Sequence, residues 1–280
     1  RDSWASRGLG DVYKRQTFYR SGMNEEMMHE TYAQDVKKYN YMISPSAFTT
    51  EVFQSAFRIN RERLIETGYP RNDFLTNYTK EDVLKIKNKY HIPLDKKVLL
   101  YAPTWRDNSY VTKGYTFKLE VDFGKWQEAL GDEYVVVFKP HYLIVNDFDI
   151  DQYQGFVYFI EANEDISNLY IISDALVTDY SSVFFDYAIL KRPIYFYMYD
   201  LVHYRDELRG FYLDIYHDLP GDIIEDENQL LVEIKKGYDF KRLETFNEKF
   251  NNHEDGKATK RVVDLSLIHI SEPTRRSWIS

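Results

Sequence analysis

The sequence predicts an α/β fold in which helices cover both faces of a parallel sheet. Short apolar runs recur from residue 97 onward, and helical stretches separate them. Near-continuous apolar strands interleaved with helices are typical of parallel sheets that are buried on both faces. The composition agrees, because 44% of the 280 residues are hydrophobic, 29% are charged, and only 12 are Gly and 8 are Pro. Disordered and collagen-like classes are therefore excluded.

The strands of this sheet are predicted in five places, and helices lie between them. The predicted strands are residues 97–102, 134–138, 156–160, 175–178 and 194–198. The predicted helices are residues 80–90, 123–130, 165–172 and 181–190, with a charged helical tail from residue 226 onward. Upstream, the pattern predicts a helix over 24–40, a short strand over 41–43, and a second helix over 46–57 that begins with Ser46 as its N-cap.

The composition also limits the function. Without Cys, the chain has neither disulfides nor Cys-ligated zinc. No apolar run approaches the roughly 18 residues of a membrane-spanning helix. A formal net charge of −9 argues against nucleic acid as a partner, although a local basic patch could still hold a small anion. No HExxH, Walker or G-x-G-x-x-G motif occurs, so the sequence requires no metal and no cofactor.

The two ends of the chain are expected to be foreign to the protein. Residues 6–16 (SRGLGDVYKRQ) can be encoded by a DNA string whose reverse complement, translated in register, gives LSLIHISEPTR, which is residues 265–275. Folding does not select for this relationship, because the opposite DNA strand never contributes to the folded chain. An inverted repeat such as a sequencing adapter explains it. We therefore expect residues 1–16 and 265–280 to be adapter-derived, and residues 17–264 to be a native fragment of a longer protein.

Polar residues follow three of the predicted strands, where ligands of parallel sheets bind. In an open parallel sheet, the ligand lies outside the carboxyl ends of the strands. Pro103 and Thr104 follow the first strand, Lys139-Pro140-His141 follows the second, and Asp-Tyr-Ser-Ser at 179–182 follows the fourth. Because these ends share one edge of the sheet, we expect the three segments to converge on one crevice.

The Asp-Tyr-Ser-Ser segment has the most specific chemistry of the three. Ser181 and Ser182 open a helix, whose first backbone N–H groups and positive dipole end favour a phosphate. Asp186 follows Ser182 by one helical turn on the same face, where its carboxylate could accept hydrogen bonds from ribose hydroxyls. The alternative is that Ser181 only caps its helix and that Asp186 is solvated.

Two other candidate residues carry a weaker signal. His141 lies two residues after Lys139, so the imidazole and the cation could contact one anion on a turn that contains Pro. A single histidine after a strand is, however, more often a surface or hydrogen-bonded residue. Arg71 lies in the Gly-Tyr-Pro-Arg-Asn-Asp turn at 68–73, and turns of that kind are common.

Five segments together resemble a known family. They are GYPRND at 68–73, LLYAPTWRD at 99–107, FKPH at 138–141, ISNLYIISDALVTDYSSVFFDYAIL at 166–190 and the RGFYLD-to-PG segment at 209–221. In order and spacing they resemble the CDP-glycerol:poly(glycerophosphate) glycerophosphotransferases of teichoic acid synthesis. The resemblance implies an α/β fold of GT-B type. Residues 17–60 would then end the N-terminal acceptor domain or form a linker, and 61–264 would be the C-terminal, Rossmann-like nucleotide-binding domain.

The resemblance also implies an activity and a set of contacts. The family transfers glycerol phosphate from CDP-glycerol to a polyol-phosphate chain on a membrane-bound lipid carrier and releases CMP, which implies a peripheral protein at the cytoplasmic face of the cell membrane. The donor contacts would fall on Arg71, Pro103, Thr104, Lys139, Pro140, His141, Ser181, Ser182 and Asp186. His141 would act catalytically by stabilising charge on the leaving diphosphate. The general base would be the His of a Trp-His-Gly-Thr-Pro motif, which we expect upstream of the fragment.

Three alternatives stay open at this point. The donor could be CDP-ribitol instead of CDP-glycerol. The chain could be another GT-B nucleotide-sugar enzyme, such as a hexosyltransferase or an epimerase, because these would use the same helix-terminus phosphate site. It could also be a fragment that binds the polymer without catalysis.

Overall fold

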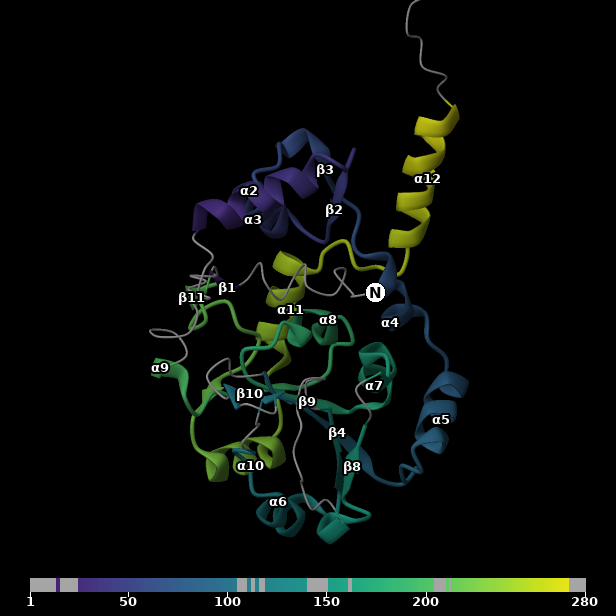
Figure 1. The fold of residues 1–280 in the computed structure, drawn as a ribbon. Coiled ribbons are helices and arrows are strands. Elements are labelled where there is room, and N and C mark those ends of the chain that lie inside the picture. Colours follow the sequence, from purple (N-terminus) through teal and green to yellow (C-terminus); the bar gives the residue numbers. More distant parts are fainter. Residues whose placement is uncertain are drawn as a thin grey trace, which may run out of the picture.

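A six-stranded parallel sheet forms the centre of the computed structural model (Figure 1). The structure describes residues 14–15, 25–104, 110–111, 114–115, 119–139, 151–160, 163–203, 210–211 and 213–271. The strands are β4 (Lys97–Ala102), β7 (Tyr134–Phe138), β8 (Val157–Phe159), β9 (Ala175–Thr178), β10 (Ile194–Tyr197) and β12 (Ile223–Ile224). All neighbouring strands run parallel. The predicted α/β class and the five predicted strands are confirmed, and β12 is an additional strand.

The order of the strands in space is β12, β10, β9, β4, β7, β8. The chain therefore starts the sheet at β4 in the middle, adds β7 and β8 on one side, and then returns to add β9, β10 and β12 on the other. The direction of addition reverses between β4 and β9, and doubly wound sheets bind their ligands at the carboxyl ends of the strands beside such a reversal.

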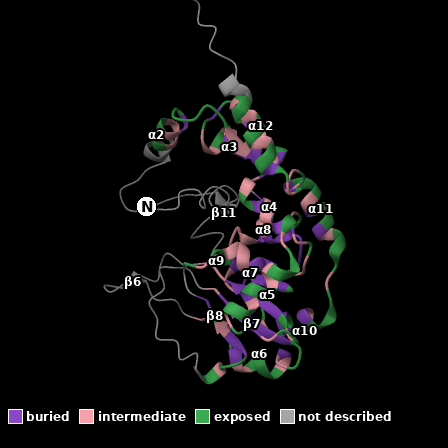
Figure 2. Cartoon of the chain, turned by 90° about the vertical axis from the view of Figure 1, so that its right-hand side faces the viewer, coloured by how far each residue is buried: buried purple, intermediate pink, exposed green. Residues whose placement is uncertain are grey.

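Helices cover both faces of the sheet, and the strand side chains alternate between them. Val98 and Leu100 pack on the face with α5 (Lys80–Lys89), α7 (Ile166–Ile172), α8 (Val183–Ala188) and α11 (Phe240–Phe250). Leu99 and Tyr101 pack on the other face, against α6 (Phe123–Leu130) and α10 (Glu227–Lys236). These four strand residues are at most 2% exposed, which is why β4 has no polar alternation. Figure 2 shows the buried strands behind helices whose outer sides are exposed.

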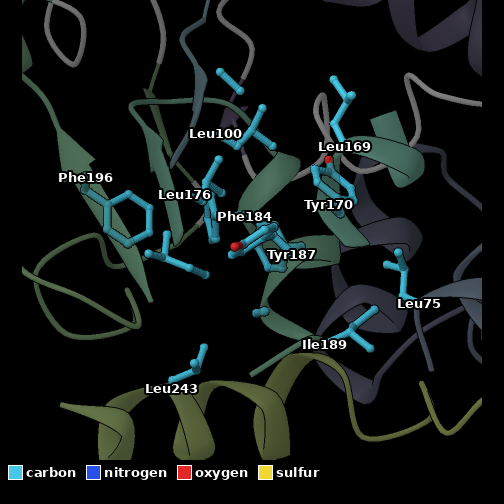
Figure 3. Packing of buried hydrophobic residues seen from close by; sticks show 14 of the residues in the cluster. Leu75, Leu100, Leu169, Tyr170, Leu176, Phe184, Tyr187, Ile189, Phe196 and Leu243 are labelled. Carbon is cyan, nitrogen blue, oxygen red and sulfur yellow. The ribbon is translucent and has the colours of Figure 1, made fainter. Parts of the chain in front are cut away.

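The α8 helix carries large apolar side chains into the core below the candidate site. Phe184 and Tyr187 lie between Leu176 of β9, Phe196 of β10 and Leu243 of α11 (Figure 3). Phe184 is 1% exposed and Tyr187 is fully buried. The helix is shorter than the predicted 181–190, but this packing fixes its orientation against the sheet.

A small lobe precedes the sheet. It contains α2 (Glu25–Val36), β2 (Met42–Ser44), α3 (Ala47–Ala56) and β3 (Leu64–Glu66), with β2 and β3 paired in parallel. The predicted helix, strand and helix are confirmed here, and the Ser46 side chain accepts a hydrogen bond from the Thr49 backbone N–H as the N-cap of α3. Phe48 stacks edge-on against Phe250 of α11 with ring centroids 4.8 Å apart, and this contact joins the lobe to the sheet domain.

The remaining elements are short, apart from the last helix. They are β1 (Lys14–Arg15), η2 (Arg61–Arg63), η3 (Pro70–Asn72), α4 (Asp73–Asn77), β5 (Tyr110–Val111), β6 (Gly114–Tyr115), η4 (Asp151–Tyr153), α9 (Leu201–His203), β11 (Gly210–Phe211) and α12 (Ala258–Ser271). The predicted helical tail is divided at Gly237, whose φ of 106° separates α10 from α11. Among the described helices, none combines the length and the apolar character that a membrane crossing needs.

Candidate functional site

The carboxyl ends of β4 and β9 lie side by side and are tied together by hydrogen bonds. The backbone N–H of Thr104 donates to the Asp179 Oδ1 at 2.7 Å, and the Thr178 hydroxyl donates to the Ala102 carbonyl at 2.8 Å. Pro103 and Thr104 are half-buried at this edge. The structure therefore brings the first and third predicted segments together at the reversal of strand order.

Asp179 also fixes the turn that leads into α8. Its side chain is 3% exposed, and its Oδ1 accepts a second hydrogen bond from the Tyr180 N–H at 2.6 Å. The buried Tyr180 hydroxyl donates to Asp200 at 3.0 Å. These contacts hold the backbone that presents the next two residues, Ser181 and Ser182, which are half-buried.

The side chains of Ser181 and Ser182 do little to cap α8. Ser182 occupies the N-cap position of α8, but its side chain makes no capping hydrogen bond. The Ser181 hydroxyl accepts a long contact of 3.5 Å from the Val183 N–H. A role in binding an anion at this turn stays a prediction, and the helix that follows is only six residues long.

Lys139 extends the same edge from the neighbouring strand. It follows β7, and its backbone N–H donates to the Tyr101 carbonyl of β4 at 3.1 Å. Burial lowers the pKa of the Lys139 ammonium, while the charges of Glu164 and Asp165 act in the opposite direction. Pro140 and His141 lie outside the described residues, so their predicted place in the crevice stays a prediction.

Glu164 is a firmly ionised neighbour of Lys139. Burial disfavours its charge, but hydrogen bonds from Lys89, Tyr90 and Asn168 outweigh this effect and lower the pKa of Glu164 to about 2. Its side chain is 6% exposed. The carboxyl end of β7 therefore combines the Lys139 cation with the Glu164 carboxylate. The carboxylate limits the net positive charge that this strand end offers to an anion.

Arg71 and Asp186 form an ion pair, although 115 positions of sequence separate them. The Arg71 Nη2 lies 3.1 Å from Oδ1 and 3.0 Å from Oδ2 of Asp186. Arg71 belongs to η3 and its guanidinium also lies over the Tyr69 ring, 5.0 Å from the centroid. Asp186 is 16% exposed, so it is not the solvated residue of the alternative interpretation. Both carboxylate oxygens are engaged, and contact with a ribose stays a prediction.

The sequence did not single out three residues that organise this region. Asp179 lies within the quoted 166–190 segment, but only the structure shows that it joins two strand ends. Asn72 is 4% exposed and donates to Asp186, and Glu254 is 9% exposed and accepts from Asn72. Glu254 lies in the charged tail that was predicted to be helical, where the sequence has no signal of burial.

A separate surface cavity lies away from these residues. Its volume is about 440 Å³, and it lies at the amino ends of β4 and β7, where Asp95, Lys96 and Asp132 line it. None of the predicted site residues contributes to it. The chemistry argued above therefore belongs to the opposite, carboxyl edge of the sheet.

Residues 12–267 match the family described as CDP-Glycerol:Poly(glycerophosphate) glycerophosphotransferase. A teichoic acid glycerol-phosphate transferase of Staphylococcus aureus is 43% identical over 249 residues, which cover 86% of this chain and 64% of that protein. A teichoic acid poly(ribitol-phosphate) polymerase of Bacillus spizizenii is 36% identical over 232 residues, covering 81% of this chain and 37% of that protein.

The solved structures agree with the sequence comparison. The wall teichoic acid polymerase TagF, from a crystal soaked with CDPG, superposes with a TM-score of 0.84 at 38% identity, over 93% of this chain and 65% of that one. This likeness confirms the predicted GT-B type of α/β fold. The chain spans less than two thirds of the length of each of these three proteins. The chain belongs to the CDP-glycerol:poly(glycerophosphate) glycerophosphotransferase family.

Proposed function

We propose that this chain carries the donor-binding part of a transferase that moves glycerol phosphate from CDP-glycerol to a polyol-phosphate chain and releases CMP. The observation that carries the proposal is the junction of β4 and β9 in a chain of this family. There the Thr104 N–H donates to Asp179, two residues before Ser181, at the reversal of strand order. A nucleotide diphosphate is the proposed ligand, because doubly wound parallel sheets bind nucleotides at this edge.

The reaction is an in-line displacement at phosphorus. An acceptor hydroxyl attacks the glycerol-side phosphorus of CDP-glycerol, the bond to the bridging oxygen of CMP breaks, and CMP leaves with the electron pair. The hydroxyl proton passes to a general base, which the family resemblance assigns to a His upstream of this sequence. The residues of this chain would position the donor and stabilise charge on the phosphoryl oxygens.

Each predicted contact has a distinct part in this proposal. Ser181 and Ser182 donate hydroxyl hydrogen bonds to the diphosphate, and Thr104 does so from the adjacent strand end. Lys139 and His141 stabilise the charge that develops on the leaving CMP, and Pro103 and Pro140 shape the two turns. Arg71 supplies positive charge beside Asp186, which contacts the ribose.

The acceptor and the location follow from the same proposal. The acceptor is a polyol-phosphate chain on a lipid carrier, and the enzyme works as a peripheral protein at the cytoplasmic face of the membrane. Flotation with liposomes that carry a lipid-linked polyol phosphate tests this part, and protein that stays in the dense fraction contradicts it.

Replacing the two serines tests the donor site directly. Changing Ser181 and Ser182 together to Val removes two hydroxyl donors and adds branched side chains at the turn. Hydrogen bonds to charged groups are each worth roughly 1.5 to 3 kcal/mol, so affinity for CDP-glycerol should fall at least about tenfold, at ~1.4 kcal/mol per decade. Calorimetric titration measures the change. Thr245→Val, an equivalent loss of a hydroxyl on the exposed side of α11, should leave affinity unchanged.

The choice of ligands separates the alternatives. Titration with CDP-glycerol, CDP-ribitol, CMP and a UDP-sugar ranks the donors, and preference for CDP-ribitol would place the chain with the ribitol-phosphate polymerases it also resembles. Preference for the UDP-sugar would indicate a hexosyltransferase or an epimerase. A folded chain, joined to its upstream segment, that binds polyol phosphate but no nucleotide would contradict the transferase proposal and support a polymer-binding fragment.

A further inference from the structure

Glu254 is a buried carboxyl group next to the proposed donor site. It lies in the turn between α11 and α12, and its side chain is 9% exposed. Its Oε1 accepts hydrogen bonds from the Tyr69 backbone N–H at 3.0 Å and from the Asn72 Nδ2 at 3.3 Å. Its Oε2 is buried and has no hydrogen-bond partner among the residues that the structure describes.

Asn72 connects this carboxyl group to the Arg71–Asp186 pair. Its Nδ2 donates to the Asp186 Oδ1 at 3.0 Å as well as to Glu254, and its Oδ1 accepts a long contact of 3.4 Å from the Arg71 Nε. The Asn72 side chain is 4% exposed, so water does not replace these contacts easily. One carboxamide thus links the turn after α11 to both members of the ion pair.

Gly68 allows Glu254 to approach this closely. Its φ is +76°, a conformation that favours glycine, and a Cβ at this position would lie 2.5 Å from the His253 carbonyl oxygen and 3.2 Å from the Glu254 Oε2. The start of the Gly68–Asn72 turn and the His253–Glu254 segment are therefore packed backbone to backbone. Glu254 contacts this turn through Tyr69 and Asn72, so it acts on the site through its neighbours.

The hydrogen-bond geometry favours a proton on Glu254. Both donors converge on Oε1, and an ionised carboxylate would leave charge on a buried Oε2 that no donor of the described residues reaches. Burial raises the pKa of Glu254 to about 7, the negative charge of Asp186 adds to this, and Arg71 and the two hydrogen bonds oppose it. The group therefore changes its charge near neutral pH.

The other charged groups around Glu254 come from four elements. Arg71 on η3 and Asp186 on α8 face it through Asn72, and Arg261 on α12 is close enough for Glu254 to raise its pKa. Arg261 is itself paired with Asp255. The preceding His253 lies 3.5 Å from Glu66 of β3. The half-buried Tyr69 completes the set, and the pKa of its hydroxyl is raised by desolvation.

We propose that Glu254 is a positioning residue of the donor site: it holds Asn72 and the Arg71–Asp186 pair in place and, by gaining or losing its proton, changes the charge that the nucleotide diphosphate meets at Arg71. This inference rests on the proposed function, because it takes CDP-glycerol as the ligand. A neutral Glu254 leaves the Arg71–Asp186 pair balanced, whereas an ionised Glu254 adds a negative charge that repels the diphosphate.

Calorimetric titration of the full chain with CDP-glycerol at pH 6 and pH 8 tests the inference. Neither the diphosphate diester nor cytosine changes its charge over this range. The wild type should bind about threefold to tenfold more weakly at pH 8, the effect of one added charge several ångströms from the ligand. Glu254→Gln keeps an acceptor oxygen and stays neutral, so it should keep the pH 6 affinity of the wild type and lose most of this dependence.

Two further variants complete the experiment. Glu254→Ala removes the acceptor for Asn72 and should bind more weakly at both pH values, with thermal melting as the check that it folds. Glu248→Gln makes the same chemical change at an exposed position of α11 and should keep the pH dependence of the wild type.

The outcomes separate the inference from the proposed function. A folded Glu254→Gln variant that keeps the whole change between pH 6 and pH 8 overturns the inference alone, and so does a wild type that binds equally well at both. A folded wild type that binds no CDP-glycerol at either pH overturns the inference together with the proposed function.

Discussion

Burial of a single carboxyl group makes the stability of the fold depend on pH. The pKa of Glu254 is raised by burial from its ordinary value near 4.5 to about 7. Well below pH 4.5 the group is protonated in both the folded and the unfolded chain, so stability there does not depend on pH through Glu254. Between pH 4.5 and 7 the unfolded chain loses this proton while the folded chain keeps it, so the free energy of unfolding falls as pH rises. Well above pH 7 both states have lost the proton, and the free energy of unfolding falls no further through Glu254.

Glu254→Gln should therefore gain stability relative to the wild type as pH rises. Raising the pKa of Glu254 from 4.5 to about 7 corresponds to about 3 kcal/mol of lost stability at high pH. Urea unfolding of both proteins at pH 4.5 and pH 8 measures it. The variant should be more stable than the wild type at pH 8. The difference between their free energies of unfolding should be larger at pH 8 than at pH 4.5 by this order of magnitude. The same difference at both pH values would show that folding does not raise the pKa of Glu254.

At the same scale, the sequence could place residues on strands but could not reveal their partners. The position of Thr104, Ser181 and Ser182 at one edge of the sheet was predictable. They follow apolar runs, and parallel strands align their carboxyl ends. The pairing of Arg71 with Asp186 was not, because 115 positions separate the two residues and local patterns contain no such contact. Glu254 was not predictable either, because its burial comes from the Gly68 turn packing against it.

At the scale of elements, prediction was most accurate where one local signal dominated. The bounds predicted for β4, β7 and β9 are those observed, since each is an uninterrupted apolar run between polar turns. The short strands β3 and β12 were missed, because each has only two apolar residues and lies in a charged stretch. Two-residue β12 is held as a strand by β10, through the register of Phe196 with Ile223, and that is a tertiary interaction.

The last helix begins with a cap from a distant part of the chain. Asp73 of α4 accepts hydrogen bonds from the backbone N–H groups of Ala258 and Thr259, both at 2.8 Å, at the start of α12. Arg261 of α12 donates to the Thr67 carbonyl at 2.8 Å. These contacts attach α12 to the same segment of chain that contains Arg71 and Asn72.

Asp73→Ala should loosen this attachment without disturbing the sheet. Loss of an N-cap costs about 1 kcal/mol, and here it also removes a contact between two segments. Hydrogen exchange should show faster exchange in α12, and urea unfolding should show the loss of stability. The control is Asp226→Ala, which removes the local cap of α10, where the Asp226 side chain accepts from the Gln229 N–H. Asp226→Ala should cost a similar free energy of unfolding but leave hydrogen exchange in α12 unchanged. If both variants speed exchange in α12 equally, Asp73 is not the cap of this helix.

At the scale of the whole molecule, the chain returns to where the sheet domain begins. The small lobe packs on α11 through Phe48, and α12 returns to the Gly68–Asn72 turn, so the segment after residue 250 lies beside the segment before residue 80 (Figure 1). The assignment of 17–60 and 61–264 to two domains stays a prediction. The pairing of β3 with β2 places residues 64–66 with the small lobe.

The predicted foreign ends can be tested on the same scale. The family match covers residues 12–267 and so leaves out most of 1–16 and 265–280, whereas α12 continues to Ser271. Leu267 is 55% exposed and Val263 is 48% exposed, so the described outer turns of this helix bury little apolar surface. A chain trimmed to 17–264 should therefore melt at the same temperature as the full chain or higher. A second chain, 17–271, separates the effects of the two ends. If trimming to 264 lowers the melting temperature by several degrees and restoring 265–271 recovers it, the last turns of α12 belong to the folded protein.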